Sequence, residues 1–192
     1  SDQDEAKFRM IEYHKWKFKA KIFSPLAPLT VKRTPVLMTR VEYGFLGSYN
    51  KYKKSPFETF YMGGDGMSGY SSTYATETIG LRGYENGSIA GNGGYNSYGY
   101  AYSRLSMELR YPFLLEPSST IYGLVFVEAG NAWRDLKDFN PFQLKRSAGV
   151  GVRIFLPMIG LMGIDWAYGF DRPDGYDQRG GSNFHFIIGQ EF

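Results

Sequence analysis

The clearest pattern in the chain is a strict alternation of apolar and charged residues close to its start, within residues 8–23. The apolar set is Trp16, Phe18, Ala20 and Ile22, and the intervening set is Lys15, Lys17, Lys19 and Lys21. Alternate side chains of a β-strand point to opposite faces, whereas a helix would scatter the four lysines around its circumference. The lysines therefore share one wet face, where they repel unless water or acidic neighbours surround them.

The same alternation recurs at 97–113, where Leu105, Met107 and Leu109 oppose Arg104, Glu108 and Arg110. A tilted strand of about ten residues crosses a bilayer, and the patterned segments are close to that length. The pattern predicts seven strands, at 8–23, 35–47, 97–113, 119–131, 145–156, 160–171 and 182–192.

The connections between these strands alternate between short or moderate and long. The shorter ones are 24–34, 114–118 and 157–159, and the longer ones are 48–96, 132–144 and 172–181. Outer-membrane β-barrels have short turns at one end and long loops at the other. A soluble antiparallel β protein with one solvated face is the alternative, but aromatic residues at strand ends favour a membrane interface.

Composition supports strands over helices, with 16 Tyr, 15 Phe and 24 Gly in 192 residues. The mean hydropathy is −0.35, and no apolar run reaches the roughly 18 residues of a transmembrane helix. This criterion does not detect the strands of a membrane barrel, because half of their residues are polar. The N-terminus has no signal peptide, so an exported protein would have to be a mature or truncated piece.

Charge and reactive residues exclude several functions. A net charge of only +3 argues against nucleic acid as a partner. The absence of Cys excludes disulfides and thiolate metal sites, and His14 and His185 lack a metal-ligand spacing, so no metal or cofactor is expected. Glu128 and Asp165 are acids on inward strand faces, but no Ser–His pair accompanies them, and the sequence predicts no enzyme.

Several segments together resemble the BamA family, the central subunits of the machinery that inserts β-barrel proteins into the outer membrane of Gram-negative bacteria. PFETFYMGG at 56–64 and the later Leu81-Arg82-Gly83-Tyr84 are similar to the family's PF…GG…VRGY signature. FVEAGNAW at 126–133, SAGVGVR at 147–153, IDWAY at 164–168 and the closing FHFIIGQEF resemble its last strands. The chain departs from the family in an enlarged insert before Leu81, in Leu81 for Val and in Glu128 for Asp.

The resemblance implies an all-β antiparallel transmembrane barrel of about sixteen strands, of which residues 1–192 would supply the last seven or eight. The RGY-containing loop would occupy about 48–96, and the upstream strands and periplasmic POTRA domains would lie outside the chain. The family's RGY loop folds into the barrel lumen, where its arginine meets an acid on the wall. This predicts a loop-to-wall lock made of Leu81, Arg82, Gly83, Tyr84, Phe126, Glu128 and Gly130.

Alternation agrees with this assignment, because Glu128 faces inward if Val125 and Val127 face lipid. Arg153 and Asp165 are further lumen-facing charges, together with the four lysines of the first strand. Gly130 would leave room on the wall for the loop, and Gly83 would let its backbone turn.

The resemblance also gives the last strand a role, as one side of a weakly paired seam that opens and templates incoming strands. We assign to the seam Phe184, Phe186, Ile188, Gly189 and Phe192, with Gly189 either weakening the strand or merely accommodating a neighbour or a kink. The expected function is assembly of outer-membrane β-barrel proteins, with outer-membrane lipids, nascent barrel proteins and accessory lipoproteins as partners. The alternatives are a polypeptide-secreting transporter of the same superfamily and a small barrel enzyme.

Overall fold

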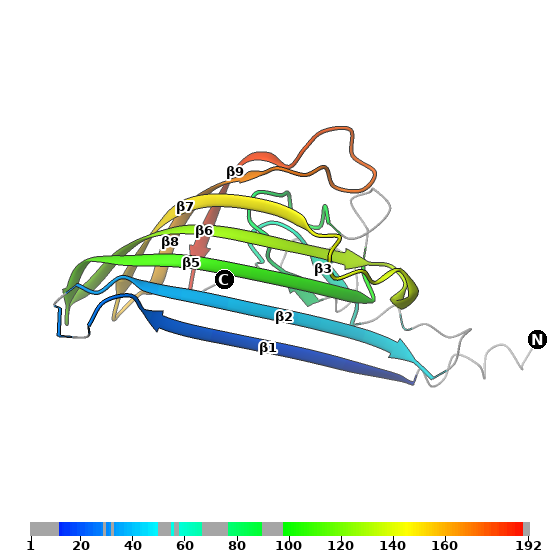
Figure 1. Cartoon of the computed structure of the whole chain (residues 1–192), viewed down its shortest axis with the longest axis horizontal. Helices are drawn as coiled ribbons and strands as arrows, with labels where there is room; N and C mark the ends of the chain where they lie inside the picture. The colour runs from blue at the N-terminus through cyan, green and yellow to red at the C-terminus, as the bar shows by residue number, and fades with distance from the viewer. Residues whose placement is uncertain are drawn as a thin grey trace, which may run out of the picture.

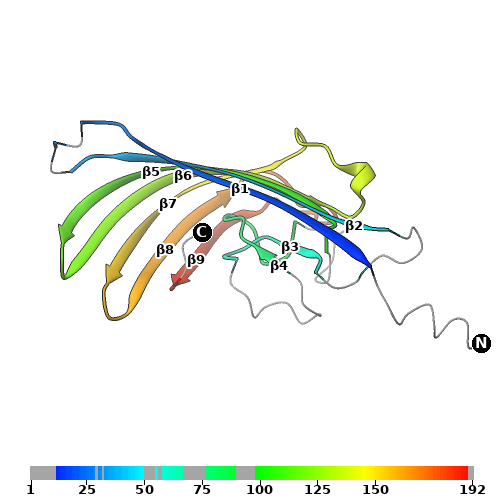
Figure 2. The same ribbon diagram turned by 90° about the horizontal axis from the view of Figure 1, so that it is seen from below.

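The computed structural model describes residues 12–28, 30–31, 33–49, 55, 58–66, 77–89 and 98–189. Seven strands form one sheet in the order β1-β2-β5-β6-β7-β8-β9, and every neighbouring pair is antiparallel. Figures 1 and 2 show this sheet curved like part of a barrel wall. Its strands are β1 (Tyr13–Pro25), β2 (Val36–Ser48), β5 (Ala101–Glu116), β6 (Ser119–Trp133), β7 (Lys145–Leu156), β8 (Gly160–Gly169) and β9 (Gly181–Ile188).

The two faces of the sheet differ as the alternation predicts. On β6, Val125 and Val127 are 57% and 52% exposed on the convex face, whereas Phe126 and Glu128 between them are buried on the concave face. The same division holds on β5, where Glu108 is buried and Met107 and Leu109 are exposed. The prediction of an antiparallel β fold with an apolar outer face and a charged inner face is therefore confirmed.

Strand boundaries differ from the prediction mainly at the ends. β1 begins at Tyr13 and continues to Pro25, and β5 runs from Ala101 to Glu116, past a register shift between Pro112 and Leu114. Proline cannot donate to the ladder, so a bulge at this point is the usual way to continue a strand beyond it. β9 ends at Ile188; of the predicted strand ends, residues 8–11 and 190–192 lie outside the described residues.

The long connection between β2 and β5 contains a small sheet that alternation did not predict. β3 (Phe60–Met62) and β4 (Glu77–Ile79) pair in parallel, and Figure 2 shows both on the concave side of the large sheet. Three residues are too few to establish a period of two. The connection between β6 and β7 holds a single 3₁₀ turn, Leu136–Asp138. Within the residues that the structure describes, no helix has the length and apolarity needed to span a membrane.

An apolar core joins this inner segment to the wall. Gly130 leaves room for the inner segment, because a Cβ on it would lie 2.4 Å from Met62 Cε and 3.2 Å from Leu81 Cδ1. The inner segment therefore packs against the wall at van der Waals distance. The core consists of Leu46, Phe60, Met62, Ile79, Leu81, Tyr84, Ile89, Tyr102 and Ala132.

Candidate functional site: the inner loop and its anchor on the wall

Residues 81–84 of the connection between β2 and β5, which we call the inner loop, lie against the charged face of the sheet. Arg82 makes most of the contacts. Its backbone N–H donates to Glu128 Oε2 at 2.9 Å, and its Nη2 donates to Glu128 Oε1 at 2.7 Å. Glu128 therefore binds both the main chain and the side chain of one loop residue. The predicted contact between Arg82 and Glu128 is present, although the acid is one methylene longer than the Asp usual in the BamA family.

Two further acids also bind the Arg82 guanidinium, so the predicted one-to-one pair is incomplete. Nη2 donates to Glu108 Oε1 at 2.6 Å, and Nη1 donates to Asp165 Oδ2 at 2.9 Å. The three carboxylates come from three strands, β5, β6 and β8. A planar fork with several donors can serve them together, which a single ammonium cannot do.

Phe126 completes the surroundings of Arg82, since the guanidinium carbon lies 3.5 Å above the centre of the Phe126 ring. The Arg82 side chain has no exposed surface. Burial alone lowers the pKa of Arg82, but the carboxylates of Glu128 and Glu108 outweigh it and raise that pKa above its ordinary value. Arg82 is therefore a permanent cation in this site.

Each of the three carboxylates also has an arginine on the wall itself. Arg104 Nη2 donates to Glu128 Oε1 at 2.8 Å, and Arg110 Nη2 donates to Glu108 Oε2 at 2.7 Å. Arg153 Nη2 donates to Asp165 Oδ2 at 2.8 Å. Each of these three acids is thus paired with an arginine of the sheet, and Arg82 adds the guanidinium that joins the three pairs.

Gly83 connects the loop to the last strand of the sheet, a contact that the sequence did not predict. Its N–H donates to His185 Nε2 at 2.9 Å, and its carbonyl accepts a bond from Asn183 Nδ2 at 3.1 Å. Both partners lie on β9. Gly83 has a φ of +89°, and a Cβ there would lie 2.8 Å from Ser147 Cβ and 2.9 Å from the Gly169 nitrogen. Only glycine fits this conformation in this space.

Tyr84 anchors the other side of the loop near the ends of β7 and β8. Its hydroxyl donates to the Arg146 carbonyl oxygen at 2.6 Å and accepts the N–H of Asp171 at 3.3 Å. Gly180 makes room for the ring, because a Cβ there would lie 2.6 Å from Tyr84 Cδ1. Burial raises the pKa of Tyr84 to about 12, so the hydroxyl keeps its proton as a donor.

We expect Tyr84→Phe to loosen the loop modestly, because it removes one hydrogen bond and retains the packing of the ring. The expected cost is about 1 kcal/mol, measured as the change in the free energy of local opening from hydrogen exchange of residues 81–85. Tyr98→Phe is the matched control. Equal opening energies in wild type and Tyr84→Phe would contradict a contribution of this hydroxyl.

The lysines of β1 form a second attachment of the inner segment. Lys15 Nζ lies 2.9 Å from Glu58 Oε2 and 3.1 Å from Glu77 Oε2, and Lys17 Nζ donates to Glu77 Oε1 at 2.5 Å. Lys19 Nζ is 3.9 Å from Glu42 Oε1, across the sheet. Acidic side chains thus lie beside the lysines of β1 and offset the repulsion between these like charges.

The residues assigned to the seam lie apart from this network, on the outer face of β9. Phe184, Phe186 and Ile188 are exposed there, and Phe192 lies outside the described residues. Gly189 has a φ of +72°, and a Cβ on it would meet no atom within 4 Å. Gly189 directly follows the last residue of β9 and bends the chain there in a left-handed conformation that other residues rarely adopt, which agrees with the interpretation of a kink rather than of a close neighbour.

Comparison with known proteins places this geometry in a family. Residues 8–192 match the family model described as the Omp85 superfamily domain. The chain belongs to the Omp85 superfamily. No curated protein sequence matches the chain significantly.

The solved structures similar to this Omp85 chain include BamA from Haemophilus ducreyi lacking POTRA domains 1–3. The TM-score is 0.57 at 20% sequence identity, and the match covers 92% of this chain and 35% of that chain. The similarity shows that this Omp85 chain has the fold of a BamA barrel wall. The chain spans about a third of the length of the BamA chain that it matches.

Proposed function

We propose that this Omp85 chain forms part of an outer-membrane barrel that inserts β-barrel proteins into the outer membrane of a Gram-negative bacterium. The anchor of Arg82 on three strands is the observation that carries the proposal. A buried network of this size holds a loop in one place inside the barrel. Superfamily membership, the BamA-like fold and the apolar outer face support the same function.

In this proposal the inner loop sets the position of the last strand. Gly83 bonds to His185 and Asn183, so the loop holds the beginning of β9. β9 pairs with β8 through Ile188, and Gly189 then ends the strand. The end of β9 beyond the loop contacts is the part that opens, and the exposed backbone then pairs with an incoming strand.

The proposed activity is non-enzymatic and uses no cofactor. Strand pairing supplies the hydrogen bonds that a nascent strand lacks in lipid, where each unsatisfied backbone group costs several kcal/mol. Nascent outer-membrane β-barrel proteins and outer-membrane lipids are the direct partners. Accessory lipoproteins of an assembly complex are further proposed partners of the full-length protein.

A photo-crosslinking amino acid at Ile188 of the full-length protein is expected to trap a nascent outer-membrane barrel protein during its assembly. The reason is that Ile188 ends β9, where the proposed seam opens. The measurement is the yield of adducts that contain a radiolabelled barrel client in cells. The same amino acid at Val152, which is exposed on the outer face of β7, a strand paired on both sides, is the matched control.

Adducts at Ile188 but not at Val152 support templating at the seam. Equal yields at both positions would contradict it. Adducts with a soluble exported polypeptide, formed at inner residues such as Lys19, would favour the secretion transporter over the insertase.

A further inference from the structure

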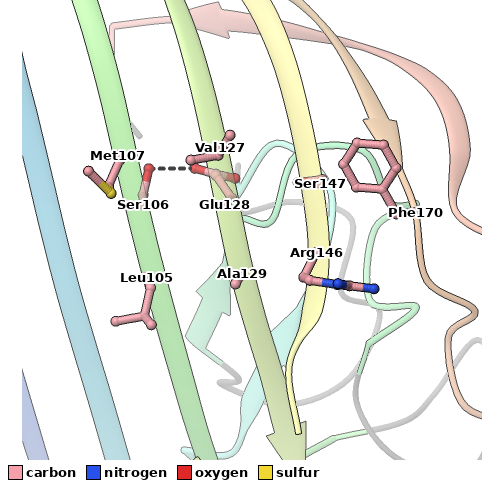
Figure 3. A pocket seen from close by; sticks show the side chains of 9 residues that line it. All are labelled: Leu105, Ser106, Met107, Val127, Glu128, Ala129, Arg146, Ser147 and Phe170. Carbon is pink, nitrogen blue, oxygen red and sulfur yellow. Dashed lines mark hydrogen bonds between the residues drawn. The ribbon is translucent and has the colours of Figure 1, made fainter. Parts of the chain in front are cut away.

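A hollow lies on the outer face of the sheet, on the side opposite the inner loop. It has a volume of about 600 Å³ and is built on β5, β6 and β7 (Figure 3). A second hollow of about 800 Å³ shares Leu105, Ala129 and Arg146 with it and extends to the connection between β6 and β7. The two hollows form one depression, which we call the rim hollow.

The register of the strands explains the depression. Ala129 pairs with Leu105 on one side and with Arg146 on the other, so the three side chains form a row across the outer face. The short side chain of Ala129 lies between two longer ones and leaves the row hollow at its centre. Met107 and Val127, one step further along the strands, line the same depression and are exposed.

The chemistry of the rim hollow changes along its length. Toward the middle of the strands its lining is mainly apolar, and toward the long connections it gains Lys145, Arg146 and Arg172 with one acid, Asp171. Asp171 accepts bonds from Arg146 Nε and Nη2, and Lys145 Nζ donates to Asp174 Oδ1 at 2.8 Å. Arg172 is exposed and makes no ion pair with another described residue.

The connection between β6 and β7 borders this cationic end. Phe142, which lines the hollow there, is 93% exposed. An aromatic ring exposed beside cationic side chains is typical of a membrane interface, where the ring contacts lipid and the charges contact headgroups. The long connections of an outer-membrane barrel lie on its outer side, so this end of the hollow faces the outer leaflet.

We propose that the rim hollow binds lipid A, the phosphorylated and acylated lipid of the outer leaflet. One acyl chain lies in the depression over Ala129, and a phosphate binds Arg146 and Arg172. Arginine forks suit phosphate oxygens, and the apolar lining suits a saturated chain. The proposal goes beyond insertase activity and rests on the proposed function only for the outer-membrane location.

Titration of the full-length protein in detergent micelles with diphosphoryl lipid A, read by native mass spectrometry, tests this proposal. Wild type is expected to retain the lipid. The double variant Arg146→Ala/Arg172→Ala is expected to weaken its apparent affinity about tenfold, because two headgroup contacts are lost. Ala129→Leu is expected to weaken it as well, because the added side chain fills the depression.

Two control variants separate this site from a general effect of charge or bulk. Lys137→Ala removes a cation from the same connection but not from the lining, and Ala20→Leu adds the same bulk to the outer face of β1; both are expected to bind like wild type. Phosphatidylglycerol bound as tightly as lipid A would overturn the proposal, as would lipid A binding unaffected by the lining variants. If the same wild-type preparation assembles a barrel client but does not bind lipid A, only the present proposal is contradicted. If it binds lipid A but does not assemble the client, the proposed insertase function is contradicted.

Discussion

Replacing Arg82 with Met is expected to release the inner loop and to abolish support of growth by the full-length protein. The variant removes the bonds to Glu108, Glu128 and Asp165 from a fully buried side chain. Breaking a buried ion pair costs about 3–5 kcal/mol. Growth after depletion of the wild-type protein, with heat-modifiable mobility of the barrel as the measure of folding, checks this expectation.

The wall is expected to survive the loss of Arg82, because each acid keeps one arginine of its own. Glu128 keeps Arg104, Glu108 keeps Arg110 and Asp165 keeps Arg153. Loss of growth with a folded barrel is therefore the expected combination. Arg134→Met, which removes an exposed arginine, is the control. Normal growth of Arg82→Met would contradict the role of the anchor.

Gly83→Ala is expected to disrupt the loop nearly as severely, although it removes no charge. The new Cβ would have to occupy space 2.8 Å from Ser147 Cβ and 2.9 Å from the Gly169 nitrogen. Crowding costs about 1–3 kcal/mol, and a left-handed backbone adds about 1 kcal/mol or more. The loss is measured as protease sensitivity of the loop and as support of growth.

Gly160→Ala separates these two costs. Gly160 has a similar φ of +92°, but a Cβ on it would meet no atom within 4 Å. Gly160→Ala therefore introduces the backbone strain without the crowding, and we expect it to have a much smaller effect on growth than Gly83→Ala. Equal effects of the two substitutions would show that strain alone, and not close packing of Gly83 on the wall, determines the phenotype.

The sequence predicted the wall well because a membrane strand repeats one simple rule along its length. Val125 and Val127 alternate with Phe126 and Glu128, so that the face of one residue indicates the face of the residues on either side of it. The inner segment follows no such rule. β3 and β4 are short and pair in parallel, and their position depends on contacts with distant residues such as Gly130.

The site could be predicted only in part for the same reason. The motif resemblance implied the pairing of Arg82 with Glu128, and alternation put Glu128 and Asp165 on the inner face. Which acids converge on one guanidinium depends on the registers between β5 and β8, and these registers are non-local. The contacts of Gly83 with His185 and Asn183 span 102 and 100 residues, and no local pattern signals them.

The central claim is that Arg82 and Gly83 together hold the inner loop against the wall and the beginning of β9. Hydrogen exchange of the full-length protein, compared between wild type and Arg82→Met, tests it most directly. We predict slow exchange at residues 81–84 and 182–185 in wild type, and faster exchange at both segments in the variant, with the amides of β5 and β6 unchanged. Unchanged exchange at 182–185 when 81–84 is released would contradict the claim.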